Sequence, residues 1–260
     1  EQARWQPSTP ITSYPAPIRA TVARKGCSAP LSADIGETLN EDCLYLNIYR
    51  PAGIKADARL PVTIFIHGGG NQAGTPASYD GTEFATHTHS IVVIPTYRLG
   101  VFGFLALAGA QSRPQGDLAL GDIISALKWT HANIAAFGGN AAGMSIVGES
   151  AGAANICDVL AAPAAHGLAT QAIMQSGFCP GRPSRAVMEA IGAATARVAG
   201  CGGPDPLPCL KRLPVQTLLS AWNTVWEQPS VTLKDGTSVP RPLFPLTPSG
   251  TALQPRAVDE

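Results

Sequence analysis

The sequence predicts an α/β fold in which a mostly parallel central sheet is flanked by helices. Two observations support this prediction. The segments 62–66 (VTIFI) and 91–94 (IVVI) are short, rich in β-branched residues and nearly continuous in apolarity, as buried parallel strands are. Helical patterns alternate with such segments along the chain, and this alternation is typical of a parallel sheet.

Each further element is expected from its local pattern. Residues 44–49 (LYLNIY) alternate apolar and polar side chains, which predicts a half-exposed strand. In 117–136 apolar residues recur at helical spacing, and the pattern ends before two glycines, so a helix is expected there. The same reasoning predicts short strands at 144–147 and 172–175 and helices at 151–162, 184–199 and 214–222.

The two ends of the chain are weakly patterned. Residues 1–37 are rich in Pro, Ser and Thr and are expected to form an irregular N-terminal segment. Residues 229–260 form a Pro-rich tail without a convincing helix, as if leading into further structure. We therefore expect residues 1–260 to be the N-terminal part of a single domain that is incomplete without a C-terminal portion.

The composition argues against several classes of partner. The 260 residues carry 18 basic and 18 acidic side chains without a Lys/Arg run, so no nucleic-acid surface is expected. The longest apolar stretches have the length of strands, so no membrane span is expected. The five histidines form no metal-like spacing with the cysteines, and we expect neither a metal nor another cofactor.

The cysteines suggest an oxidising compartment. Two of the segments between them, 27–43 and 201–209, are polar or turn-prone loops whose ends can approach each other. The chain begins with Glu and has no signal-like apolar segment, which fits a secreted or periplasmic protein whose signal peptide has been removed. The alternative is a set of buried free thiols in a cytosolic protein. The even number of cysteines allows many pairings, and spacing alone does not choose among them: Cys27, Cys43, Cys157, Cys179, Cys201 and Cys209.

The motif GESAG at 148–152 matches G-x-S-x-G between a predicted strand and a predicted helix. Glycines two positions before and after Ser150 allow the strand and the helix to approach at a sharp turn. The serine is then held on a strained backbone with its hydroxyl exposed above the sheet. This arrangement indicates a nucleophile for acyl transfer.

The motif HGGG at 67–70 directly follows the predicted strand 62–66. Glycines are needed in such a loop because main-chain N–H groups must turn toward an oxyanion, and a Cβ would obstruct that approach. The alternative is a glycine-rich turn together with an unrelated serine at a helix N-cap. Composition alone would produce both motifs in one chain about once in a thousand, which favours a catalytic interpretation.

With these two motifs and several other stretches in the same order, the chain resembles the type-B carboxylesterase/lipase family, which includes cholinesterases and bacterial para-nitrobenzyl-type esterases. The resemblance covers about residues 10–245 and implies an α/β-hydrolase fold that hydrolyses carboxylic esters of small molecules. The other matching stretches are 41–47 (EDCLYLN), 97–100 (YRLG) running into FGF, 116–129 (GDLALGDIISALKW), 133–140 (NIAAFGGN) and 175–177 (QSG).

The resemblance implies a role for each site residue. Ser150 would be the nucleophile. The N–H groups of Gly69, Gly70 and Ala151 would form the oxyanion hole. Glu149, beside the nucleophile, would influence the electrostatics of the site.

The resemblance also implies structural pairs. Two disulfides, 27–43 and 201–209, match the usual loops of the family, which leaves Cys157 and Cys179 as an additional pair. Glu41 and Arg98 match an internal ion pair, the alternative being two separately solvated charges. Asn71 stands where the family usually has an aromatic residue, so we expect it to affect the shape and polarity of the acyl-side pocket.

The general base is the missing part. In α/β-hydrolases the chain order is serine, acid, histidine. After Ser150 the only histidine is His166, in a loop expected at the surface, where it is interpreted as a solvated side chain. We therefore expect the catalytic acid and histidine from a second polypeptide or a separate C-terminal segment, and no activity from this chain alone.

Three hypotheses remain at this point. The preferred one is the N-terminal polypeptide of a secreted carboxylesterase. The second is a non-catalytic, cholinesterase-like binding or adhesion module, against which the intact GESAG and HGGG motifs argue. The third is a truncated product that does nothing by itself.

Overall fold

The computed structural model describes residues 4–11, 13, 16–17, 19–22, 26–29, 40–55, 57–109, 114–179, 181–246 and 248. The strands are β1 (Leu46–Tyr49), β2 (Leu60–Ile66), β3 (Ile91–Pro95), β4 (Gly139–Glu149), β5 (Gln171–Gln175), β6 (Ser230–Thr232) and β7 (Ser238–Pro240). The α-helices are α1 (Thr82–His87), α2 (Gly100–Phe104), α3 (Leu118–Asn133), α4 (Ala151–Ala161), α5 (Arg185–Val198), α6 (Leu207–Arg212) and α7 (Val215–Trp226).

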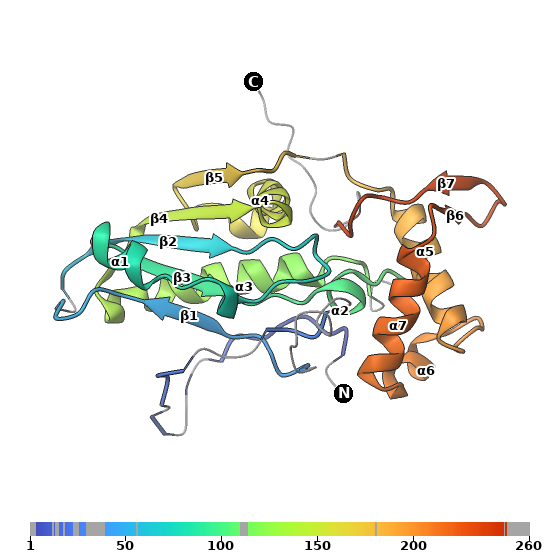
Figure 1. Ribbon diagram of the computed structural model, residues 1–260, viewed down its shortest axis with the longest axis horizontal. Helices are drawn as coiled ribbons and strands as arrows, with labels where there is room; N and C mark the ends of the chain where they lie inside the picture. The colour runs from blue at the N-terminus through green and yellow to red at the C-terminus, as the bar shows by residue number, and fades with distance from the viewer. Residues whose placement is uncertain are drawn as a thin grey trace.

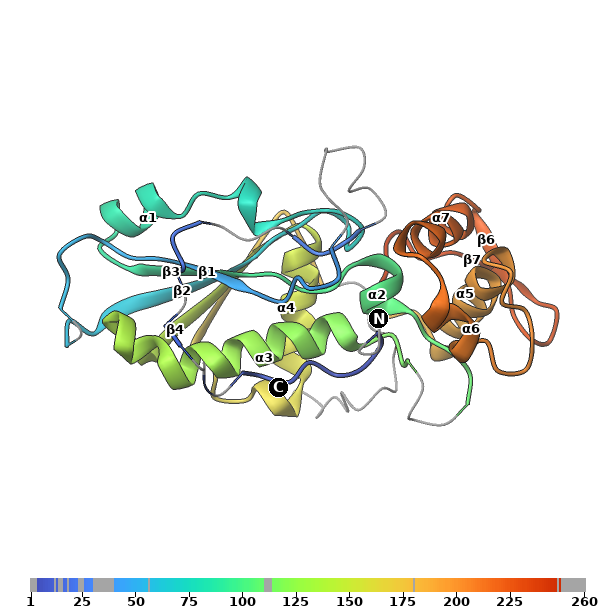
Figure 2. The same ribbon diagram turned by 90° about the horizontal axis from the view of Figure 1, so that it is seen from below.

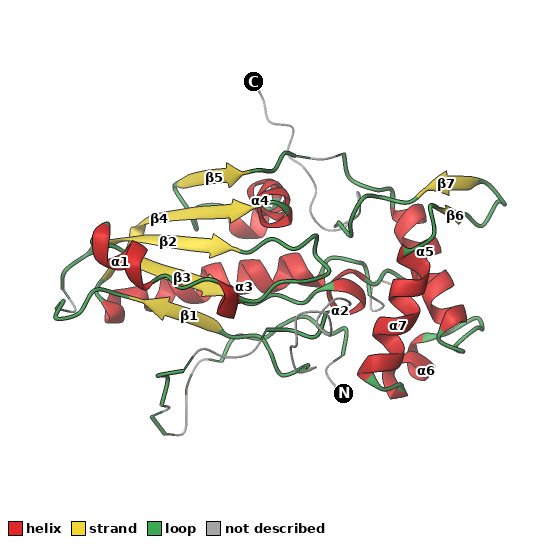
Figure 3. Ribbon diagram, viewed as in Figure 1, coloured by secondary structure: helices red, strands yellow, loops and turns green. Residues whose placement is uncertain are grey.

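A five-stranded sheet forms the centre of the molecule (Figures 1 and 3). Its strand order is β1-β3-β2-β4-β5, with β1 antiparallel to β3 and the other neighbours parallel. The parallel strands point toward α5, α6 and α7, so their carboxyl ends meet at that edge of the sheet (Figure 1). In α/β proteins this edge is where ligands bind. The mostly parallel sheet flanked by helices is the expected fold.

The helices cover the two faces of the sheet unequally (Figure 2). On the face covered by α3 and α4, β2 contributes Val62, Ile64 and Ile66 to the main core. On the opposite face Phe65 is only partly buried and packs against a small cluster that includes Ala85 of α1. β2 is therefore fully buried on one face, which corrects the expectation of a strand buried on both.

Helices α5, α6 and α7 and the hairpin β6–β7 form a lobe beside the carboxyl ends of the parallel strands (Figures 1 and 2). Trp222 of α7 and Met188 of α5 are fully buried in the main core. The Trp222 indole N–H donates a hydrogen bond of 3.2 Å to the Gln72 side chain. The lobe thus contacts the segment that directly follows the HGGG motif.

All the strands and helices expected from the sequence are present, although β4 begins earlier, at Gly139. Sequence patterns did not indicate α1, α2, α6 or the hairpin β6–β7. Helix α2 contains two glycines and α6 contains a proline, and both residue types weaken a helical pattern. The hairpin lies in the tail that was expected to be irregular, although Asp235-Gly236 between its strands is a common turn signal.

The three disulfides confirm the pairing implied by the resemblance. They are Cys27–Cys43, Cys157–Cys179 and Cys201–Cys209, with Cα–Cα separations of 4.9, 5.6 and 5.6 Å. The second disulfide joins α4 to the segment that follows β5. The same segment contacts the start of α4 at Gly177, where an added Cβ would lie 2.4 Å from the Ala153 Cβ and 2.9 Å from Ser150 O.

The expectation of an ion pair between Glu41 and Arg98 is wrong. Arg98 pairs with Asp122 of α3 through two hydrogen bonds of 2.7 Å, from Nε and Nη2. Glu41 instead accepts bonds of 2.5 and 2.6 Å from Arg4. Asp122 forms the ion pair with Arg98 because its buried carboxylate lies directly against the guanidinium, and both carboxylate oxygens match the planar fork of arginine.

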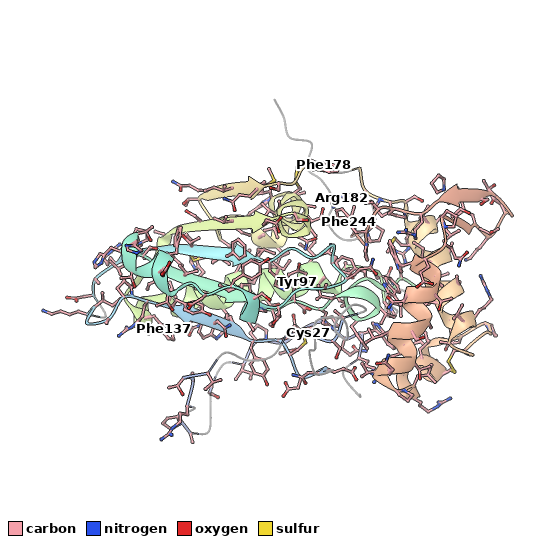
Figure 4. All side chains as sticks on the ribbon, in the orientation of Figure 1. Cys27, Tyr97, Phe137, Phe178, Arg182 and Phe244 are labelled. Carbon is pink, nitrogen blue, oxygen red and sulfur yellow. A yellow bond between two sulfur atoms is a disulfide. The ribbon has the colours of Figure 1, made fainter. Side chains whose placement is uncertain are left out.

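Strand β5 is an exposed edge of the sheet. All five of its residues are exposed, including Ile173 at 50% and Met174 at 41%. Phe178, labelled at the top of Figure 4, is 64% exposed just beyond this strand. Within the described ranges no strand pairs with the outer side of β5. An uncovered apolar edge of this kind is a site for pairing with another strand.

Candidate active site

Ser150 lies at the turn between β4 and α4, where GESAG predicts it. Its φ of 54° and ψ of −120° lie outside the regions that suit non-glycine residues. The backbone is fixed on both sides, because Ser150 N–H donates to Gln175 O at 2.9 Å and Ser150 O accepts from Ala154 N at 3.1 Å. The side chain is partly exposed, and no described group forms a hydrogen bond with its Oγ.

The glycines of GESAG allow a backbone contact between β2 and α4. A Cβ at Gly152 would lie 2.1 Å from the Ile66 carbonyl oxygen, and one at Gly148 would lie 2.6 Å from the Gly152 carbonyl carbon. Both distances are too short for any side chain. Helix α4 therefore begins against the end of β2, which is where the HGGG loop starts.

The HGGG loop passes beside Ser150. A Cβ at Gly68 would lie 3.1 Å from the Ser150 Cβ. Gly69 and Gly70 have φ values of +104° and +62°, which favour glycine. The Ala151 N–H is one of the first amides of α4, which lack an intrahelical acceptor. The structure thus brings the loop that carries Gly69 and Gly70 to the same corner as Ser150 and Ala151.

Glu149 is the last residue of β4 and is partly exposed. A Cβ at Gly68 would lie 2.4 Å from Glu149 Oε2, so this carboxylate packs directly against the HGGG loop. The Glu149 side chain therefore lies beside the loop that reaches Ser150, and its effect on the site stays a prediction.

His67 lies under the loop and is unavailable to a substrate. Its side chain is 1% exposed, stacks on Tyr97 at 4.5 Å between ring centroids, and places Nδ1 2.9 Å from Gly68 O. Burial lowers the pKa of His67 to about 4, so the ring is neutral at pH 7. Burial also raises the pKa of Tyr97 far above its usual value, which keeps its hydroxyl protonated, and it donates a 2.7 Å hydrogen bond to His67 O.

Asn71, the residue after HGGG, lies in the interior, and its effect on the acyl-side pocket stays a prediction. Its side chain is fully buried and forms hydrogen bonds with Asn155 of α4 and with the Pro245 carbonyl. Sequence reasoning did not identify Asn155. The available signal was a polar residue at a buried position of an otherwise apolar, Ala-rich helix.

The histidines do not supply a base for Ser150. His166 is exposed at the end of a short 3₁₀ turn (Pro163–Ala165), as expected. The three histidines that precede Ser150 outside the HGGG motif are also exposed, and none forms a hydrogen bond with the serine: His87, His89 and His131.

Among the described residues, no group of three or more His, Cys, Asp or Glu side chains is arranged to hold a metal ion. In the same part of the chain, no helix is long and apolar enough to cross a membrane.

Known proteins similar to this chain are carboxylesterases and other esterases. The family model described as "Carboxylesterase family" matches residues 1–252. Liver carboxylesterase 1 of Mus musculus is 36% identical over 240 residues, which is 87% of this chain and 40% of the relative. Cocaine esterase of Oryctolagus cuniculus is 36% identical over 208 residues, covering 78% of this chain and 38% of the relative.

A solved structure titled PNB esterase matches with a TM-score of 0.78 and 34% identity, covering 86% of this chain and 47% of the matched one. The fold is therefore that of the α/β-hydrolases. The chain belongs to the carboxylesterase family. It spans less than half the length of these relatives.

Proposed function

We propose that this chain provides the nucleophile and the oxyanion hole of a carboxylic ester hydrolase. The observation that carries the proposal is the strained turn at Ser150, with φ of 54°, placed against a glycine loop whose backbone has positive φ. Strain of this kind at a partly exposed serine is typical of a nucleophile elbow. Membership of the carboxylesterase family supports the same chemistry.

In the proposed reaction, Ser150 Oγ attacks the ester carbonyl carbon while a general base accepts the hydroxyl proton. The carbonyl oxygen becomes an oxyanion, stabilised by the N–H groups of Gly69, Gly70 and Ala151. The intermediate collapses to an acyl-serine and releases the alcohol, which receives the proton. Water then attacks the carbonyl carbon of the acyl-serine while the base accepts a proton from the water. The second intermediate releases the carboxylic acid, and the proton returns to Ser150 Oγ. Glu149 contributes negative charge beside the nucleophile.

The base and its orienting acid are proposed to come from a C-terminal segment or a second polypeptide. Three observations favour this source. Among the described residues, no histidine forms a hydrogen bond with Ser150 and no strand pairs with the outer side of β5, and the relatives are more than twice as long as their matched portions. A segment that adds a strand to β5 would cover the edge and reach the Ser150 corner, which lies at the carboxyl ends of the strands.

We also propose that the protein is secreted or periplasmic. The three disulfides support an oxidising compartment, because disulfides form and persist there.

The function is tested by hydrolysis of a p-nitrophenyl ester by the full gene product and its Ser150→Ala variant. Losing the nucleophile should reduce kcat by about 10⁴-fold or more, with KM little changed. Ser145→Ala, on the same strand, is the matched control and should retain activity. Residues 1–260 expressed alone should show no Ser150-dependent turnover; if they do, the separate base is wrong.

If the gene product is folded but shows no Ser150-dependent turnover of any ester tested, the catalytic proposal fails. The non-catalytic binding or adhesion module then becomes the better hypothesis.

A further inference from the structure

The contacts of Asn71 form a buried polar cluster at the base of the HGGG loop. Asn71 Nδ2 donates to Asn155 Oδ1 at 3.1 Å and to Pro245 O at 2.8 Å, while Asn155 Nδ2 donates to Asn71 Oδ1 at 2.8 Å. The Tyr97 hydroxyl lies 3.4 Å from Asn71 Oδ1. The Asn71 amide thus uses both of its donors, and its Oδ1 accepts from Asn155, while the Tyr97 proton goes to His67 O.

This cluster is buried, so each contact matters. Asn71 and Tyr97 are 0% exposed and Asn155 is 3% exposed. Removing one amide leaves a donor and an acceptor of the other amide unpaired, and water cannot replace the lost partner without opening the structure. The two amides can satisfy each other only when the loop and α4 keep their present separation.

The cluster also joins parts of the chain that are distant in sequence. Asn71 follows Gly70 directly, and Asn155 lies on α4, one helical turn beyond Ala151. Asn71 has a φ of +56°, a conformation that asparagine tolerates better than most residues, and its carbonyl accepts from Gly100 N at 2.8 Å. The main chain and side chain of Asn71 are therefore both fixed.

We infer that the Asn71–Asn155 amide pair is a positioning device that fixes the HGGG loop to the nucleophile helix. Asn71 directly follows Gly69 and Gly70, whose N–H groups are the proposed donors. Asn155 belongs to α4, the helix that presents the Ala151 N–H. The pair sets the distance between the two sources of oxyanion-hole N–H groups. This inference rests on the proposed function for its catalytic consequence, whereas its mechanical consequence is independent of catalysis.

The test uses two substitutions in the full gene product. Asn71→Asp keeps the volume and tolerates positive φ but loses both donors. Asn155→Leu removes the partner amide within a helix. Thr195→Val is the matched control, because it removes a buried side-chain hydrogen bond of 2.9 Å on α5, away from Ser150. If Asn155→Leu does not fold, Asn155→Ser replaces it.

Both Asn variants should lower kcat for a p-nitrophenyl ester by about 10²-fold, with KM changed less than about threefold, because a 1 Å misplacement of catalytic groups costs about that factor. Thr195→Val should leave kcat unchanged. In the same proteins, hydrogen–deuterium exchange of the peptide containing residues 67–75 should accelerate in the Asn variants and not in the control.

The outcomes separate the two proposals. Folded Asn variants with wild-type kcat, or with raised KM and unchanged kcat, overturn the positioning role in catalysis. Unchanged exchange at 67–75 overturns the inference whether or not the protein is an esterase. If wild type lacks Ser150-dependent turnover, the proposed function fails, and the exchange experiment still decides whether the pair fixes the loop.

Discussion

Acidification should destabilise this protein through His67. The ring is fully buried, and burial lowers its pKa from 6.5 to about 4. Below pH 6.5 His67 therefore binds a proton in the unfolded chain but not in the folded state. The unfolded state is favoured as pH falls. The loss begins near pH 6.5 and is complete near pH 4, where the folded state also becomes protonated.

The magnitude follows from the two pKa values. Between pH 7 and pH 5, His67 alone should lower the free energy of unfolding by about 2 kcal/mol. Urea unfolding at constant salt, followed by tryptophan fluorescence at both pH values, measures this loss. Carboxyl groups also titrate in this range, including Asp117, whose pKa is raised by burial. The comparison must therefore be made between variants.

His67→Gln removes the titration while keeping a polar side chain. The variant should lose about 2 kcal/mol less than wild type between pH 7 and pH 5. His166→Gln, at an exposed position, is the control and should follow the wild-type curve. Parallel pH dependences for wild type and His67→Gln would refute the reasoning that His67 is buried in the neutral form.

Three further predictions concern glycines and a disulfide. Gly70→Ala should lower kcat by about 10²-fold in ester hydrolysis, because alanine disfavours φ of +62° and turns a donor away; a wild-type kcat would contradict the oxyanion role. Replacing Cys157 and Cys179 together by Ala should lower the free energy of unfolding by about 3 kcal/mol for a separation of 22 residues, and an unchanged urea midpoint would argue against that disulfide. Gly152→Ala should prevent folding, because its Cβ would lie 2.1 Å from Ile66 O. Gly121→Ala in α3 has open space around its Cβ and should stabilise the protein by about 0.5–1 kcal/mol in thermal melts. Equal behaviour of the two variants would contradict the backbone contact at Gly152.

The fold and the placement of Ser150 beside the HGGG loop were predictable because their sequence signals are local. β-branched segments, helical spacing and glycine positions depend on neighbours in sequence, and the two motifs placed Ser150 and the HGGG loop at strand ends. The hairpin β6–β7 and helix α2 were missed because Pro and Gly obscured short elements whose stability comes from packing.

Long-range polar pairing was the part that sequence reasoning did not reach. Arg98 is paired with Asp122 on a helix, and Asn71 with Asn155, 84 positions away. A charge or an amide in a sequence indicates that a partner is needed when it is buried, but not which partner the fold supplies. The expected pairing of Glu41 with Arg98 failed for this reason.

Ser150 is proposed to be a nucleophile that is activated in the assembled protein. The most direct measurement is labelling of the full gene product with a fluorophosphonate, followed by mass spectrometric mapping of the modified residue. We expect a single phosphonylated serine, Ser150, with labelling abolished by Ser150→Ala and slowed by a competing ester. Rapid labelling of a different serine, or unchanged labelling of the Ser150→Ala protein, would contradict it.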